Sequence, residues 1–288
     1  MIPFEYHAPA TVGDAVAMLA ARDGAKLLAG GQSLVPALTY RLARPGVLVD
    51  INALPLADVV RTNGHVRLGA LVRHHVLEES PDVRRWCPLL AEAVAYVGNA
   101  RVRTLGTLGG SLAHADPAAE LPVAMVALDA RFAAVGAAGS REIPAGEFFR
   151  APLTTALAAD EILTAVDVPV TRGAGTAFVE LARRPGDFPL VSVAAVVAVD
   201  RAGRVADARV VFGGLAGAPQ RSAPAEDALR GHEPTPERIA AAAHAARRAL
   251  RPETDVFASG AYRAHLAEVL ARRALRTATN RALTVEVR

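Results

Sequence analysis

The stretch Lys26-Leu27-Leu28-Ala29-Gly30-Gly31-Gln32-Ser33-Leu34 joins a short apolar run to two glycines and a hydroxyl residue. Its first part predicts a β-strand over 26–29, and the apolar residues after it predict a short helix over 34–41. Gly30 and Gly31 allow positive φ and a close approach of the backbone to a ligand, so successive N–H groups can converge on an anion. The dipole of the following helix adds to this attraction.

A second stretch, Gly106-Thr107-Leu108-Gly109-Gly110-Ser111, repeats the combination of two glycines with hydroxyl residues. Two such loops suit a pyrophosphate, although a lone Gly-Gly pair more often makes only a tight turn. Neither loop contains GxxxxGK[ST], and the sole lysine, Lys26, precedes its glycines, which excludes a nucleotide-triphosphate P-loop. The GxGxxG pattern of the usual dinucleotide fold is also missing from both loops. A phosphate ligand would therefore be bound in another way.

The composition is that of a globular protein. Of 288 residues, 52% are apolar and 21% are charged, which favours one large domain or two to three modest lobes. The formal net charge is +3, and the arginines are scattered in pairs without a basic run, so a nucleic-acid surface is not supported. The N-terminal stretch lacks the pattern of a secretory signal, and no run reaches the roughly 18 apolar residues of a membrane span. We therefore expect a cytoplasmic protein without a membrane span.

Cys87 is the single cysteine of the chain. One cysteine cannot form an intrachain disulfide, a CxxC redox pair or a thiolate zinc site, and it cannot hold an iron–sulfur cluster alone. We interpret Cys87 as a small buried side chain next to Trp86.

The rest of the chain predicts an α+β fold. A Gly-rich stretch, Val170-Thr171-Arg172-Gly173-Ala174-Gly175, is typical of a linker or exposed loop and suggests a domain edge. The other expected elements are a helix capped by Thr11 with Asp14 and running to about Ala21, strands over 47–50 and 65–68, helices from about 74 and over about 88–97, an antiparallel hairpin of 191–199 and 205–212, and helices over 236–250 and 259 to about 280.

Four runs carry a resemblance that covers nearly the whole chain: AGGQSLVPALTYRLARPGVLVDIN (29–52), RLGALVRH (67–74), VRTLGTLGGSLAHADPAAELP (102–122) and ARRPGDFPLVSVAA (182–195). They closely resemble the FAD-binding, or medium, subunits of the xanthine dehydrogenase and carbon monoxide dehydrogenase family, the molybdenum hydroxylases. The resemblance implies a two-lobed FAD-binding domain of the PCMH (vanillyl-alcohol-oxidase-like) type over 1–172, with lobes of about 1–55 and 56–172. A C-terminal sheet-plus-helices lobe, like that of the CO dehydrogenase flavoprotein, would follow over 173–288.

The same resemblance implies where FAD is held. The pyrophosphate and sugar-phosphate region would be held by the two loops, and Glu120 would take the place of an acidic residue, usually Asp, on the cofactor. Leu163 would make an apolar contact near the flavin ring. The residues implied are Ala29, Gly30, Gly31, Gln32, Ser33 and Leu34 in the first loop, Thr107, Gly109, Gly110 and Ser111 in the second, and Glu120 and Leu163.

By resemblance, the function is electron transfer. Electrons would come from a molybdopterin-binding large subunit through a 2Fe-2S small subunit to FAD in this chain, and then pass to NAD⁺, a quinone or oxygen. One alternative is a stand-alone FAD-dependent oxidase or dehydrogenase that acts directly on a small molecule. Another is a binding or scaffold module with an empty nucleotide pocket.

One segment departs from the family. Many relatives carry a lysine near the flavin just before the arginine pair, but here that segment is Phe178-Val179-Glu180-Leu181-Ala182. A cation close to the ring would stabilise the anionic reduced flavin, so its absence bears on the flavin potential and the electron acceptor. We hypothesise that Arg183 or Arg184 takes its place.

Four other features have both a functional and a structural interpretation. His114 with Asp116 could be metal ligands or an acid–base pair, but Pro117 favours a loop fixed by side-chain hydrogen bonds. The adjacent histidines His74 and His75 could bind a metal, but a simpler interpretation is that they begin a helix, with one side chain buried and one solvated. Asp187 could form a salt bridge with the preceding arginines or lie near the flavin or a partner. The helix over 236–250 is more typical of core packing than of recognition.

Overall fold

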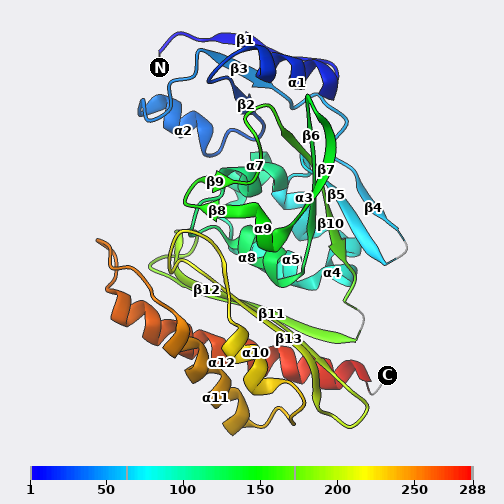
Figure 1. The fold of residues 1–288 in the computed structure, drawn as a ribbon, viewed down its shortest axis with the longest axis vertical. Helices are drawn as coiled ribbons and strands as arrows, with labels where there is room; N and C mark the ends of the chain where they lie inside the picture. Colours follow the sequence, from blue (N-terminus) through cyan, green and yellow to red (C-terminus); the bar gives the residue numbers. More distant parts are fainter. Residues whose placement is uncertain (1, 63, 172, 287–288) are drawn as a thin grey trace.

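Three lobes follow one another along the long axis of the molecule (Figure 1). The computed structural model describes residues 2–62, 64–171 and 173–286. Buried apolar side chains form three clusters: one in the N-terminal lobe, one centred on the middle lobe, and one between the C-terminal sheet and its helices. The α+β fold class predicted from the sequence is confirmed.

The N-terminal lobe is a three-stranded parallel sheet in the order β1-β3-β2. Between β2 and β3 the chain passes through the first glycine loop and a short helix, which is a crossover connection between parallel strands. The Thr11 cap is confirmed, because its Oγ1 accepts from the Asp14 N–H at 3.1 Å. The elements are β1 (Glu5–His7), α1 (Val12–Ala21), β2 (Lys26–Leu28), α2 (Leu34–Thr39) and β3 (Val47–Asp50).

The middle lobe packs helices against a five-stranded antiparallel sheet in the order β4-β5-β10-β6-β7. Helix α8 is buried along its whole length and forms the centre of the core. The strands are β4 (Val59–Arg61), β5 (His65–Gly69), β6 (Arg131–Gly136), β7 (Gly139–Pro144), β10 (Ile162–Pro169), and the separate pair β8 (Phe149–Ala151) and β9 (Thr154–Thr155). The helices are α3 (His74–Glu79), α4 (Pro81–Trp86), α5 (Pro88–Tyr96), α6 (Ala100–Leu105), α7 (Leu108–His114), α8 (Glu120–Ala127) and α9 (Ala145–Phe148).

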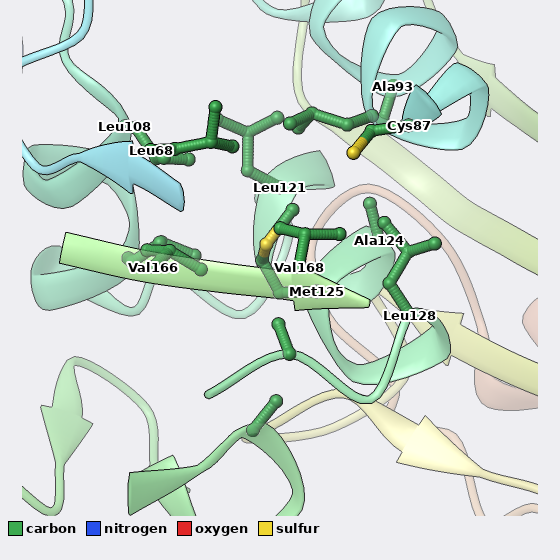
Figure 2. Packing of buried hydrophobic residues seen from close by; sticks show 14 of the residues in the cluster. Leu68, Cys87, Ala93, Leu108, Leu121, Ala124, Met125, Leu128, Val166 and Val168 are labelled. Atoms are coloured by element: carbon green, nitrogen blue, oxygen red, sulfur yellow. The ribbon is translucent and has the colours of Figure 1, made fainter. Parts of the chain in front are cut away.

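Cys87 belongs to this core. Figure 2 shows it among the buried side chains around α8, which include Leu121 and Met125, with Val166 and Val168 of β10 nearby. Burial raises the pKa of the thiol to about 12, so almost no thiolate forms at neutral pH. The interpretation of Cys87 as a packing residue is confirmed.

The C-terminal lobe is a four-stranded antiparallel sheet in the order β11-β12-β13-β14, covered on one side by three helices. The predicted hairpin is confirmed, with Ala195 paired to Val210 and the connection at residues 200–204. The elements are β11 (Ala174–Ala182), β12 (Pro189–Val199), β13 (Val205–Gly213), β14 (Gln220–Arg221), α10 (Ala223–Leu229), α11 (Pro236–Ala249) and α12 (Gly260–Glu286). Helix α11 packs its small apolar side chains into the core, which confirms the packing interpretation of that segment.

Both faces of this sheet are buried. Val191 and Val193 of β12 face the helices, whereas Ala194 and Val196 belong to the core cluster of the middle lobe. Side chains alternate between the faces of a strand, so β12 joins two cores. The face that carries Ala194 and Val196 lies against α5 and α8, and this contact fixes the C-terminal lobe on the middle lobe.

The predicted linker at 170–175 is wrong for its last two residues. Ala174 and Gly175 begin β11, and Gly175 is buried against α12. A glycine is present because the backbone of α12 approaches so closely that a side chain would not fit. Arg172, in the same stretch, lies outside the described residues.

We expect Gly175→Ala to destabilise the protein. An added Cβ would lie 1.9 Å from the Ala278 carbonyl oxygen and 2.4 Å from the Ala282 nitrogen, so α12 would have to move off the sheet. Such overpacking costs about 1–3 kcal/mol of unfolding free energy, measured by thermal or urea unfolding.

Gly13→Ala in α1 is the matched control. Its Cβ would meet only Thr11 Oγ1, at 3.8 Å. Alanine favours the helix by about 1 kcal/mol, so this variant should be as stable as wild type or more so. Equal stability of the Gly175→Ala and Gly13→Ala variants would contradict the packing argument.

Candidate functional site

The two glycine loops, far apart in the sequence, lie in direct contact. A Cβ built on Gly30 would lie 2.2 Å from the Leu105 carbonyl oxygen and 2.9 Å from the Gly106 Cα. The first loop comes from the N-terminal lobe and the second from the middle lobe, so their contact joins the two lobes at the site.

The first loop presents free backbone donors. Gly31 has φ of +70°, a left-handed conformation that favours glycine, and its carbonyl accepts from the Val35 N–H at 2.9 Å as α2 begins. Gln32 Nε2 donates to the Gly30 carbonyl at 3.0 Å and steadies the turn. Within the described ranges, the N–H groups of residues 30–33 donate no backbone hydrogen bond. Unpaired successive N–H groups of this kind suit an anionic ligand.

The second loop uses its donors differently. Thr107 caps α7, with its Oγ1 accepting from the Gly110 N–H at 3.1 Å. The Leu108 N–H donates to Val72 and the Gly109 N–H to Ala70, at 2.9 and 2.8 Å. The prediction that successive N–H groups of this loop face a ligand is therefore wrong for these three residues.

The reason is the packing of α7 on the end of β5. A Cβ on Gly109 would lie 2.6 Å from the Ala70 Cβ, so this glycine serves close packing between helix and strand. The parts of the loop accessible to a ligand are the exposed backbone of Gly110 and the partly exposed Ser111.

A polar network that the sequence analysis did not single out holds the two loops together. Asn52 Nδ2 donates to the Ala29 carbonyl at 2.9 Å, and Arg73 Nη2 donates to Asn52 Oδ1 at 2.8 Å. Arg73 also donates to the Leu105 carbonyl. Asn52 and Arg73 fall inside two of the runs that carry the family resemblance, and that was the only sequence signal for them.

Asp50 anchors this network to the N-terminal sheet. Its Oδ1 accepts from Asn52 Nδ2 at 2.7 Å, and its Oδ2 accepts from the Tyr6 hydroxyl at 2.6 Å. Partial burial alone would raise the pKa of Asp50, but the hydrogen bonds from Tyr6 and Asn52 lower it overall. Asp50 is therefore an ionised acceptor at neutral pH.

His74 is hydrogen-bonded to the backbone of the second loop. Its side chain is buried, and Nε2 lies 2.9 Å from the Thr107 carbonyl oxygen. Burial lowers the pKa of His74 to about 4, so the ring is neutral and Nε2 carries the proton that it donates to Thr107. His75 is only partly buried, and α3 begins at His74 as expected.

Glu120 and Leu163 are both buried, at 3% and 4% exposure. Leu163 lies in β10 within the core of the middle lobe. Glu120 begins α8, and burial, with a smaller contribution from the charge of Asp116, raises its pKa to about 7. At neutral pH this carboxyl is therefore protonated about half of the time.

The remaining candidates are structural or exposed. Asp116 Oδ1 accepts from the Ala118 N–H at 2.9 Å, which confirms a loop fixed by a side-chain hydrogen bond.

Arg183 and Arg184 are exposed, and the Arg183 guanidinium lies 5.8 Å from the centre of the Phe257 ring.

Of the two interpretations of Asp187, the salt bridge is wrong, because the described structure contains no ion pair of this residue. Its N–H instead donates to the Arg184 carbonyl at 3.1 Å. Gly186 has φ of +83°, so the backbone itself closes the turn and the carboxylate is left exposed.

Among residues 2–62, 64–171 and 173–286, no helix has the length and apolar character needed to cross a membrane. The same ranges contain no group of three or more His, Cys, Asp or Glu side chains placed to hold a metal ion.

Comparison with known proteins gives two family matches. Residues 2–171 match the FAD binding domain in molybdopterin dehydrogenase, and residues 176–278 match the CO dehydrogenase flavoprotein C-terminal domain. The 6-hydroxypseudooxynicotine dehydrogenase complex subunit alpha of Paenarthrobacter nicotinovorans is 40% identical, over 97% of this chain and 95% of its own length. The carbon monoxide dehydrogenase medium chain of Hydrogenophaga pseudoflava is 37% identical, over 96% and 98%. The structure of quinoline 2-oxidoreductase from Pseudomonas putida superposes with a TM-score of 0.94 at 35% identity, over 98% of this chain and 99% of that chain.

We expect Arg73→Met to loosen the contact between the loops. Methionine keeps the aliphatic stem but removes the hydrogen bonds to Asn52 and Leu105. Losing such bonds costs about 0.5–1.5 kcal/mol each, so amide hydrogen exchange over residues 28–34 and 100–106 should become about fivefold faster or more.

Arg101→Met is the control on the neighbouring helix. Arg101 is exposed, and the hydrogen bond that involves it is made by its backbone N–H, which the substitution retains. Unchanged exchange in both variants would show that Arg73 does not hold the loops.

Proposed function

The chain belongs to the family of FAD-binding domains of molybdopterin dehydrogenases, and from this membership we propose that it is the electron-carrying flavoprotein subunit of a molybdenum hydroxylase complex. The resemblance seen in the sequence is confirmed, and so is FAD as the cofactor. The relatives include subunits of dehydrogenases and of a hydroxylase, so the chain is part of an oxidoreductase.

The assignment of the FAD site rests on the unused backbone N–H groups of the first glycine loop. Residues 30–33 offer backbone N–H donors that the described chain does not use, and Gly30 lies against the segment that leads into α7. A pyrophosphate supplies the acceptors that such donors lack. We assign to the site Ala29, Gly30, Gly31, Gln32, Ser33 and Leu34 in the first loop, Thr107, Gly109, Gly110 and Ser111 in the second, and Glu120 and Leu163 nearer the ring.

The residues of the second loop act mainly by position. Thr107 and Gly109 fix α7 on β5, and Gly110 and Ser111 are the accessible part. The Asp50–Asn52–Arg73 network keeps the two loops at one spacing. A loop pair held in place before the ligand binds loses less conformational entropy on binding.

Bound FAD supplies the capacity to accept and release electrons, and this chain supplies the site. We propose that the electrons come from a 2Fe-2S small subunit, which receives them from a molybdopterin-binding large subunit. The single, buried Cys87 cannot hold such a cluster, which supports its location on another chain. The proposal includes a cytoplasmic complex and a division of this chain at residues 172/173, close to the gap between the two family matches.

Gly30→Ala tests the FAD site. The added Cβ would collide with the Leu105 carbonyl and push the loops apart, so FAD should bind at least about tenfold more weakly, a loss of about 1.4 kcal/mol. Flavin absorbance of the purified protein and titration of the apoprotein with FAD measure this loss. In Gly46→Ala an added Cβ meets nothing within 4 Å, and this control should bind FAD like wild type. Equal FAD affinity of both variants would contradict the assigned site.

Purification of the chain from its native source tests the subunit role. We expect two further chains to copurify, with molybdenum and iron detected by metal analysis and the chains identified by mass spectrometry. A lone flavoprotein that is reduced directly by a small-molecule substrate would overturn the subunit proposal and favour a self-sufficient oxidase.

A further inference from the structure

A second polar cluster lies between the middle lobe and the C-terminal sheet. Glu180 of β11 pairs across the strands with Ser192 of β12, which pairs in turn with Gly213 of β13. Residues directly opposite each other share a face, so these three lie on the face of the sheet where β11 packs against α5, and β12 and β13 pack against α8. Glu120 begins that helix.

The geometry at Gly213 shows where Ser192 points. A Cβ built on Gly213 would lie 2.5 Å from Val123 Cγ2 of α8 and 2.6 Å from Ser192 Oγ. The serine hydroxyl therefore lies in the layer between the sheet and α8. Ser192 is completely buried, and its Oγ has no hydrogen-bond partner within the described chain; the same holds for the buried Oε2 of Glu180.

The electrostatic surroundings of the two carboxyls are acidic. Asp116 precedes α8, and α5 contributes Tyr96 and Glu92. Arg281 of α12 is bound to Glu92 and to the Thr176 carbonyl. Across residues 2–62, 64–171 and 173–286, no arginine or lysine side chain bonds to Glu120 or Glu180.

We propose that Glu120 and Glu180 form a carboxyl pair that holds one exchangeable proton between the two lobes. Glu120 is buried, Glu180 has a buried Oε2, and both face one layer without a bound cation, so the two carboxyls cannot both ionise easily and one keeps its proton. We assign this proton to Glu180 Oε2, which is buried and has no hydrogen-bond partner; the unpartnered Ser192 Oγ faces the same layer.

The titration behaviour agrees with this geometry. Burial, with a smaller contribution from the charge of Glu120, raises the pKa of Glu180 to about 8, and that of Glu120 rises to about 7. The two groups interact, so these values describe the pair and not each residue alone. The pair therefore loses its protons between about pH 6 and pH 9.

The pair also bears on electron transfer, and this part rests on the proposed function, which assigns Glu120 to the flavin site. Electrons from the proposed iron–sulfur cluster add negative charge to the flavin. A carboxyl pair beside the ring can release its proton toward that charge, which leaves a carboxylate that solvent protonates again.

Infrared spectroscopy of the wild-type apoprotein tests the pair without any substitution. We expect the C=O stretching band of a protonated buried carboxyl to be present at pH 6 and absent at pH 9. In Glu180→Gln the band should titrate at a lower pH, because the remaining Glu120 has the lower pKa of the two, about 7 against about 8. Absence of a protonated carboxyl in wild type at pH 6 would overturn the proposal.

Unfolding of the apoprotein as a function of pH gives a second readout. The folded pair has pKa values above the unfolded value of 4.5, so the folded state binds more protons, and stability falls as the pH rises from about 5 through about 8. Glu180→Gln should flatten this fall. Glu142→Gln, on exposed β7, should retain the wild-type slope. Equal slopes in all three proteins would overturn the pair.

Potentiometry of the FAD-loaded protein tests the coupling to the flavin. We expect the flavin potential to depend less on pH in Glu180→Gln than in wild type and in Glu142→Gln. An unchanged potential, with an altered unfolding slope, would overturn the placement beside the flavin while supporting the proton-holding pair. Failure of wild type to bind FAD would instead overturn the proposed function.

Discussion

The close contact between Gly30 and the Leu105 carbonyl is the constraint on which the site depends. It brings a loop of the N-terminal lobe onto the segment that leads into the second loop. The contact is possible only because Gly30 has no side chain, and Arg73 and Asn52 then tie both backbones together. The two loops therefore form one surface, although they belong to separate hydrophobic cores.

The two loops contribute unequally to that surface. In the first, the backbone turns through Gly31 and leaves its N–H groups free. In the second, the corresponding groups are consumed by the packing of α7 on β5 and by the Thr107 cap. Because α2 and α7 span only six and seven residues, we attribute anion binding to individual N–H groups of the first loop more than to helix dipoles.

Local patterns in the sequence predicted the local features well. The Thr11 cap, strand β3, the hairpin of β12 and β13, and the packing of Cys87 and α11 each depend on a few neighbouring residues, and each is confirmed. Features that depend on distant contacts were missed or mistaken. Gly175 was assigned to a linker because its need for glycine comes from α12, about a hundred residues later, and the Arg73 network becomes visible only once three chain segments meet.

The pair of Glu120 and Glu180 also depends on contacts between distant segments, so the sequence alone did not reveal it. In the sequence, Glu120 and Glu180 are two unrelated carboxylates of a chain with nearly balanced charge. The fold places them on facing elements of one layer, because one face of the C-terminal sheet packs β12 and β13 on α8 and β11 on α5, and Arg281 is bound to Glu92 instead. Keeping two carboxyls there without a cation opposes folding as the pH rises, and neutral residues of similar size would remove that cost. Buried carboxyls with raised pKa values concentrate at functional sites, so this cost favours a role for the proton over a role in packing.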